Sequence, residues 1–203
     1  YEAGLKLFTQ SLEIAQKLFY EGHTTIAKAL NKIASAMLAI GESVLAEKKT
    51  REVIDMLTNS PNKGNIQLAK AYDNLGSIYS ETGRHEQAID VLLSSYAIKK
   101  DYYGVDRDYE LGITLNRIGR AYDSKDEDTI AEGYCLKSKE HYEKFFGPDH
   151  PVTADVYLNL GTVYISLNQY EKGMEHYQQF YKISIKTYGL LHPNISQAYF
   201  AFG

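Results

Sequence analysis

Residues 71–104, AYDNLGSIYSETGRHEQAIDVLLSSYAIKKDYYG, have the spacing of two amphipathic helices joined by a tight turn. On each side of Gly83, apolar and small side chains recur every three or four residues, as on one face of a helix. The two faces consist of Tyr72, Leu75, Gly76 and Tyr79, and of Ala88, Leu92, Ser95 and Ile98. Because Gly76 and Ala88 carry at most one side-chain carbon, they predict helix axes about 8 Å apart.

The same template recurs through the whole chain at intervals of 42, 42, 43 and 42 residues. The small residue of the second helix recurs as Gly4, Ala46, Ala88, Ala131 and Gly173. The small residue of the first helix recurs as Ala34, Gly76, Gly119, Gly161 and Gly203. The turn within each pair carries Gly41, Gly83, Asp126 and Asn168, residue types that tolerate the left-handed conformation at the end of a helix. A regular array of helix pairs is therefore predicted.

The pattern Y-x-x-L-G-x-x-Y at residues 72–79, followed nine residues later by Ala88, resembles the tetratricopeptide repeat, whose unit is about 34 residues. The longer period and the inter-repeat segments FGPDHP (146–151) and YGLLHP (188–193) are similar to the kinesin-light-chain type of that repeat. The resemblance implies an all-α fold, a right-handed α-solenoid of antiparallel helix pairs. It also implies a concave groove that holds extended peptides, often acidic ones with an aromatic or apolar anchor.

The expected organisation is a single array over residues 1–203, with partial repeats at both ends. The complete helix pairs are expected at 23–58, 65–102, 108–145 and 151–188. Residues 1–20 match a second helix, whose first helix we expect upstream, and residues 193–203 match the start of a further first helix. Because the open ends are apolar where such arrays carry polar caps, we expect flanking sequence or a second copy to cover them.

Composition narrows the classes of partner. The formal net charge is −4 with both signs interspersed, which argues against nucleic acid or an anionic membrane as the primary ligand. No apolar run approaches the roughly 18 residues that a membrane span requires. The single cysteine, Cys135, cannot form an internal disulfide and favours a reducing, cytoplasmic location.

No catalytic constellation, cofactor motif or metal site is recognised, so we predict a protein that is not an enzyme and needs no cofactor. His85 and Glu86 begin a helix as a zinc-protease motif would, but the second histidine is replaced by Ile89. Three histidines share one repeat position just before a first helix and are interpreted as linker residues: His23, His150 and His192.

Two further positions leave alternatives open. His141 stands where the other repeats carry aliphatic residues, and is either a satisfied, partly buried histidine or a pH-sensitive position. Cys135 stands at a packing position, which we favour over a reactive thiol.

The remaining candidate site is the groove face of the first helices, which we call the polar row. Its sixteen positions hold five basic residues and two acidic ones, against an overall negative chain. The peptide-binding candidates are Lys28, Asn31, Lys32, Lys70, Asp73, Asn74, Ser77, Asn116, Arg117, Arg120, Leu158, Asn159 and Thr162. The other three positions are Ser35, Ile113 and Asp155. Asparagine suits pairing with the backbone of an extended peptide, and Lys and Arg suit carboxylates. The alternative is that these residues only keep an exposed helix face soluble.

Three hypotheses for function remain. The leading one is an adaptor or scaffold that binds an extended, acidic peptide segment of a protein partner. The second is a sensory or regulatory arm of a larger signalling enzyme or transcription factor. The third is a structural module that associates with itself through the open ends of the array.

Overall fold

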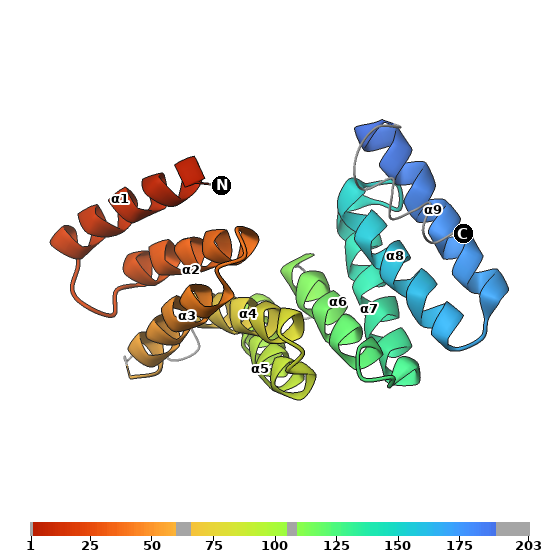
Figure 1. Cartoon of the computed structure of the whole chain (residues 1–203), viewed down its shortest axis with the longest axis horizontal. Helices are drawn as coiled ribbons and strands as arrows, with labels where there is room; N and C mark the ends of the chain where they lie inside the picture. The colour runs from red at the N-terminus through yellow and green to blue at the C-terminus, as the bar shows by residue number, and fades with distance from the viewer. Residues whose placement is uncertain (1, 60–65, 105–108, 190–203) are drawn as a thin grey trace. The chain divides into compact units, whose positions relative to one another are not determined.

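The chain folds into antiparallel helices in a computed structural model that describes residues 2–59, 66–104 and 109–189 (Figure 1). The helices are α1 (Glu2–Leu18), α2 (Thr24–Ala39), α3 (Ser43–Thr58), α4 (Ile66–Glu81), α5 (His85–Tyr103), α6 (Tyr109–Asp123), α7 (Asp128–Phe146), α8 (Pro151–Ser166) and α9 (Tyr170–Tyr188). No strand occurs in these ranges, and the predicted all-α fold class is confirmed. The partial repeat predicted at 193–203 lies outside the described residues.

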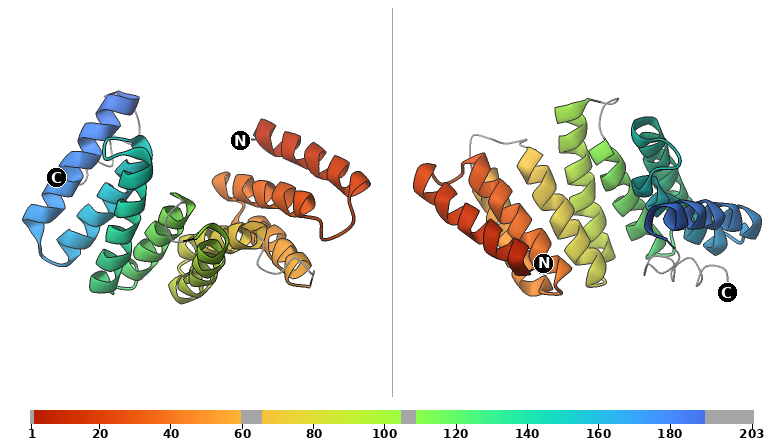
Figure 2. Two further views of the ribbon diagram at one scale, coloured as in Figure 1. Left: turned by 180° about the vertical axis from the view of Figure 1, so that it is seen from behind. Right: turned by 90° about the horizontal axis from the view of Figure 1, so that it is seen from above.

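The chain divides into two compact units, Tyr1–Val105 with α1–α5 and Asp106–Gly203 with α6–α9. In each unit every helix packs against the next one along the chain, which Figures 1 and 2 show as neighbours running in opposite directions. The first helices also contact each other within a unit, α2 with α4 and α6 with α8. The polar row lies on these first helices.

Glycines in the first helices allow the close approach that the small-residue pattern predicts. A Cβ added to Gly76 would lie 2.5 Å from Leu92 Cγ, and one added to Gly119 would lie 2.5 Å from Cys135 Sγ. The crowding partner is thus the second-helix residue one turn after the small residue. Ala88 and Ala131 are fully buried. A side chain at Gly76 or Gly119 would therefore push the two helices of its pair apart.

The turns within the helix pairs adopt the conformation predicted from their residue types. Gly41, Gly83, Asp126 and Asn168 have φ of 86°, 74°, 60° and 58°. The residue after each of them donates its backbone N–H to a carbonyl five positions earlier, at 2.8–3.0 Å, which satisfies an orphan carbonyl at the helix end. The prediction of left-handed turn residues is confirmed.

The linker histidines have a structural role that the sequence did not reveal. His23 and His150 each cap a first helix, because Nδ1 accepts the backbone N–H of Thr25 or Val152 at 3.2 Å. Their rings stack on Phe19 and Phe146, with centroids 4.2 and 4.5 Å apart. These contacts fix the entry of the chain into α2 and α8. His192 lies outside the described residues.

The core of each unit lies between its helices. Cys135 is fully buried in an apolar cluster with Val156 and Leu160, and this burial raises the pKa of its thiol to about 12. It therefore packs as a small apolar side chain and is not a reactive thiol. His141 is partly buried and lies near the C-terminal end of α7.

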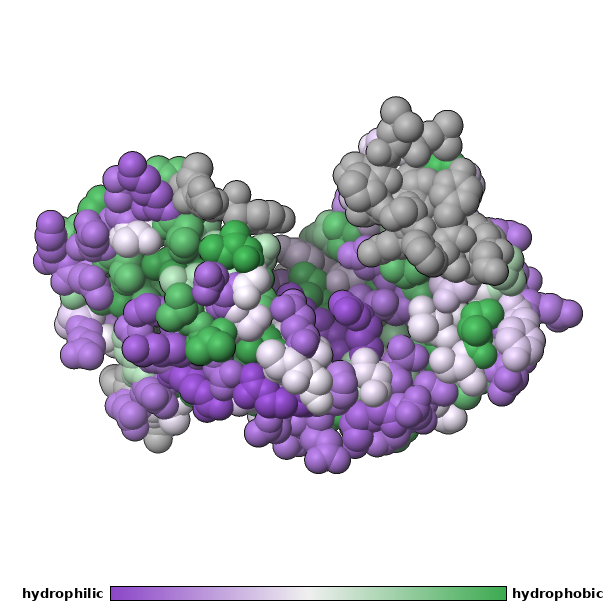
Figure 3. Space-filling view, viewed as in Figure 1, coloured by the Kyte–Doolittle hydropathy of each residue, from purple (hydrophilic) through white to green (hydrophobic). Residues whose placement is uncertain are grey.

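Apolar surface also remains outside the core. In Figure 3, apolar patches alternate with polar ones over α1 and α2 of the first unit. The most exposed large apolar side chains of α1 are Leu7, Ile14 and Leu18. None of the helices in the described ranges combines the length and apolarity that crossing a membrane would need.

Candidate peptide-binding site

The thirteen candidates of the polar row differ in exposure. Lys28, Lys32, Arg120 and Thr162 are exposed. Lys70, Asn74, Ser77, Arg117, Leu158 and Asn159 are partly exposed. Asn31, Asp73 and Asn116 are buried, with 5%, 5% and 9% of their surface exposed. The exposed and partly exposed residues can reach a ligand, whereas the three buried ones are placed to hold the helices beneath it.

In the first unit, asparagines join the two first helices. Asn31 Nδ2 of α2 donates to the Gln67 carbonyl of α4 at 2.8 Å. Asn74 Nδ2 of α4 donates back to the Asn31 carbonyl at 3.1 Å, and its Oδ1 accepts the Ser35 hydroxyl at 3.0 Å. These hydrogen bonds occupy amide groups that the sequence predicted to bind a peptide.

Asp73 belongs to a buried polar network between α4 and α5. Its two carboxylate oxygens accept from Ser95 Oγ at 2.7 Å and from the Lys99 ammonium, which is itself 1% exposed. Ser95 Oγ also lies 2.9 Å from the Ala69 carbonyl. The negative charge of Asp73 is therefore compensated by Lys99 inside the unit, and it does not offset the basic residues on the surface of the unit.

The exposed part of the row in the first unit is basic. Lys28 and Lys32 lie one turn apart on α2, and Lys70 lies on α4, which packs against α2. The Lys32 ammonium lies over the Phe8 ring of α1, 5.2 Å from its centroid. With Asp73 buried, this face carries lysines and neutral polar groups, and suits a carboxylate-bearing ligand.

The second unit repeats the asparagine pairing with a different charge balance. Asn159 Nδ2 of α8 donates to Asn116 Oδ1 of α6 at 2.8 Å. Thr162 accepts the Tyr177 hydroxyl at 3.2 Å. The guanidinium of Arg120 acts electrostatically on Asp123, whose pKa is raised chiefly by burial and lowered in part by that arginine. Arg120 also acts electrostatically on Asp155, an exposed acidic member of the row, so the row of this unit carries exposed charges of both signs.

A charged aromatic cluster between α3, α4 and α5 was not found from the sequence. Arg84 Nη2 lies 2.6 Å from Glu47 Oε2, and its guanidinium lies 4.2 Å from the Tyr79 ring centroid. Arg51 Nη2 donates to the Tyr79 hydroxyl at 2.6 Å. The hydrogen bond from Arg84 is the main cause that lowers the pKa of Glu47. Glu47 and Arg51 come from α3, Tyr79 from α4 and Arg84 from the N-cap of α5, so spacing within one helix gave no signal for the cluster.

Metal binding finds no support in the described part of the chain. No group of three or more His, Cys, Asp or Glu residues there is arranged to hold a metal ion. The exposed and partly exposed part of the polar row presents ammonium, guanidinium, amide and hydroxyl groups, together with the Asp155 carboxylate in the second unit.

Several solved structures share this fold. BtubC (BKLC) from P. vanneervenii is 20% identical with a TM-score of 0.76, and the match covers 100% of this chain and 84% of that one. A putative kinesin light chain from Podosopora anserina, with nearly identical TPR-like repeats, is 18% identical with a TM-score of 0.67, over 91% and 87% of the two chains. Aspartyl phosphate phosphatase F from Bacillus subtilis is 15% identical with a TM-score of 0.75, over 97% and 49%. No match was found among curated proteins.

The family model of the tetratricopeptide repeat matches residues 25–101 and 110–186. The two matches cover more than half of the sequence and coincide with the helix pairs α2–α5 and α6–α9. The likeness to a putative kinesin light chain agrees with the repeat type inferred from the 42-residue period. The resemblance seen in the sequence is confirmed, and the chain belongs to the tetratricopeptide repeat family.

Proposed function

We propose that this chain is a non-catalytic protein-interaction module that binds an extended, acidic peptide segment of a partner along the polar row, as an adaptor or scaffold. One observation carries the proposal. Lys28 and Lys32 are exposed on α2, while the acidic member of the row in the same unit, Asp73, is buried against Lys99. The part of the row in the first unit is therefore basic, in a chain whose net charge is −4.

The two units contribute differently in this proposal. The first unit supplies lysines for carboxylates through charge-assisted hydrogen bonds. The second unit, taken by itself, offers the partly exposed Leu158 and Ile113 to an apolar side chain of a peptide bound on that unit, on the same first helices as Arg117 and Arg120. Asn31 and Asn116 are buried beneath the row and hold neighbouring first helices together by hydrogen bonds. A cytoplasmic location fits this role and the single buried thiol.

A regulatory arm of a larger signalling protein is the second candidate function. The observation that favours it is the likeness to aspartyl phosphate phosphatase F, of which the match spans about half, 49%. On this alternative the polar row binds an effector whose occupancy changes a linked activity. Sequencing of the intact gene decides between the two, because a linked enzymatic or DNA-binding domain favours the regulatory arm.

The proposal is tested with an array of peptides that differ only in the number of Asp and Glu residues. The wild-type chain is expected to prefer acidic peptides, and the Lys28→Glu, Lys32→Glu double variant is expected to lose that preference. The matched control is Lys6→Glu, Lys17→Glu, which changes the net charge equally at exposed lysines of α1 outside the row. Equal loss in both variants, or no acidic preference in the wild type, contradicts the proposal.

A further inference from the structure

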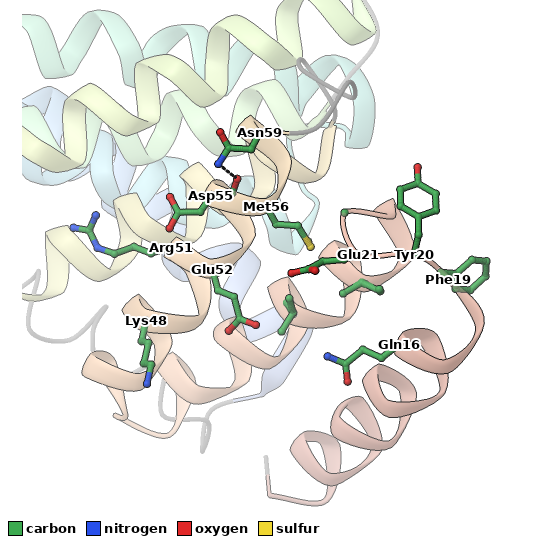
Figure 4. Close-up of a pocket in the computed structure, with 13 residues that line it drawn as sticks. Gln16, Phe19, Tyr20, Glu21, Lys48, Arg51, Glu52, Asp55, Met56 and Asn59 are labelled. Carbon is green, nitrogen blue, oxygen red and sulfur yellow. Dashed lines mark hydrogen bonds between the residues drawn. The ribbon is translucent and has the colours of Figure 1, made fainter.

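A hollow of about 1170 Å³ lies in the first unit between the second helices α1 and α3, above α2 (Figure 4). Ile26 and Leu30 of α2, 6% and 1% exposed, lie at its base. Met56 of α3 projects toward the space in Figure 4, whereas the rings of Phe19 and Tyr20 point away from it. The polar row contributes no lining residue, so the hollow is separate from the peptide site proposed above.

A difference between the first repeat and the last coincides with the hollow. The residues equivalent to Leu30 are Tyr72, Leu115 and Tyr157. In the second unit the Tyr157 hydroxyl donates to Glu143 of α7 at 2.6 Å, and its ring lies 6.0 Å from that of His176 on α9. That tyrosine therefore reaches both second helices and occupies the space between them. Leu30 lacks the ring and the hydroxyl to do so between α1 and α3.

The rim of the hollow is charged, and its charges are unevenly compensated. Arg51 is paired with Glu47 at 2.9 Å, and Glu52 with Lys49 at 2.7 Å. The exposed side chains of Glu21 and Asp55 form no hydrogen bond or ion pair with any described residue.

Lys48 is the other rim charge without such a partner among the described residues. Two uncompensated carboxylates thus stand against one ammonium group. The apolar base and the acidic rim define complementary chemistry, an apolar side chain next to a basic one.

We propose that the hollow is a second binding site, which takes an aliphatic side chain of a partner protein's peptide segment flanked by Arg or Lys. The aliphatic side chain packs on Met56, the partly exposed apolar residue of the lining, above the buried Ile26 and Leu30. The flanking cations pair with Glu21 and Asp55. The first unit would then bind segments of opposite charge at two places, acidic ones on the polar row and basic ones at the hollow.

The test is an NMR titration of the isotope-labelled chain with the peptide Gly-Gly-Arg-Leu-Arg-Gly-Gly. Two control peptides carry Ala in place of Leu, or Glu in place of both Arg. We expect saturable shifts confined to residues 16–30 and 48–59 with the first peptide. Both controls are expected to bind about tenfold more weakly or worse. Absence of saturable shifts at the hollow overturns the proposal.

Two variants make the test specific. Leu30→Tyr directs toward the hollow the side chain that the chain itself carries at Tyr72 and Tyr157, and is expected to weaken binding about tenfold. Glu21→Lys, Asp55→Lys keeps the hollow and reverses the two uncompensated carboxylates, with Glu13→Lys on α1, outside the hollow, as a control. Unchanged peptide binding in both variants contradicts the proposal. The proposal is also contradicted if Leu30→Tyr binds the peptide like the wild type but no longer associates with itself.

Discussion

Gly76 and Gly133 lie inside helices but in different surroundings. A Cβ on Gly76 would lie 2.5 Å from Leu92 Cγ, while one on Gly133 would meet nothing within 4 Å. Leu92 is fully buried and has no room to move aside. We predict that Gly76→Ala lowers the free energy of unfolding by about 1–3 kcal/mol through overpacking. Gly133→Ala is expected to raise it by about 0.5–1 kcal/mol through backbone entropy. Urea unfolding of both variants measures this, and equal effects would rule out the close approach.

Asp73 and Lys99 form a buried pair that the neighbouring repeat replaces with Asn31 and Leu57. Lys99→Leu alone leaves a buried carboxylate without its cation, and we expect it to cost about 3–5 kcal/mol of unfolding free energy. The double variant Asp73→Asn, Lys99→Leu installs the neighbour's combination and is expected to recover most of that loss. A double-mutant cycle by urea unfolding measures the coupling, and additive losses would contradict the account.

At the scale of helices, Asn74 links α2 to α4 and Asn159 links α8 to α6. Asn74→Ala removes two inter-helix hydrogen bonds, and we expect a loss of about 1–2 kcal/mol in unfolding free energy. Asn159→Ala removes one such bond in the second unit and is expected to cost about half as much. If both variants keep wild-type stability in thermal unfolding, these asparagines do not hold the first helices together.

His176 lies where α7, α8 and α9 meet, with its ring centroid 5.1 Å from that of Tyr164. Burial is the main cause that lowers its pKa, and Lys139 adds to the lowering, while the backbone hydrogen bond at Lys172 and the carboxylates of Glu175 and Glu143 act in the opposite direction. The folded state therefore binds fewer protons than the unfolded state, so stability falls as pH drops through the ordinary histidine pKa of about 6.5. We predict that the Tm of the wild type falls more steeply between pH 7 and 5 than that of His176→Gln. Parallel Tm curves would contradict this assignment.

At the scale of the whole molecule, the repeat pattern was visible in the sequence because it depends on local geometry. Gly83 and Asn168 end helices through their own backbone conformation, and Gly76 permits close packing through its missing side chain. Burial of Asp73 could not be predicted, because it depends on Lys99, which lies 26 residues away on another helix. The capping role of His23 was not predicted either, because histidine is not among the residues that usually cap helices.

The sequence predicted which residues form the row, but not which of them are buried and which are exposed. Helical spacing placed Asn31 and Lys32 on one face, yet the first is buried and the second exposed. The difference comes from the packing of α4 on α2, which covers one edge of the row. The row of the first unit is also more basic than the sequence indicated, because packing of α5 on α4 buries Asp73.

Isothermal titration tests the central claim, that the lysines of α2 recognise acidic peptide segments. The whole chain is titrated with the strongest acidic peptide from the array, as wild type, as Lys28→Glu, Lys32→Glu and as the control Lys6→Glu, Lys17→Glu. We predict that the first double variant raises Kd about tenfold or more, while the control changes it by about twofold or less. If both variants bind the peptide like the wild type, or both lose affinity equally, the polar row is not the binding site.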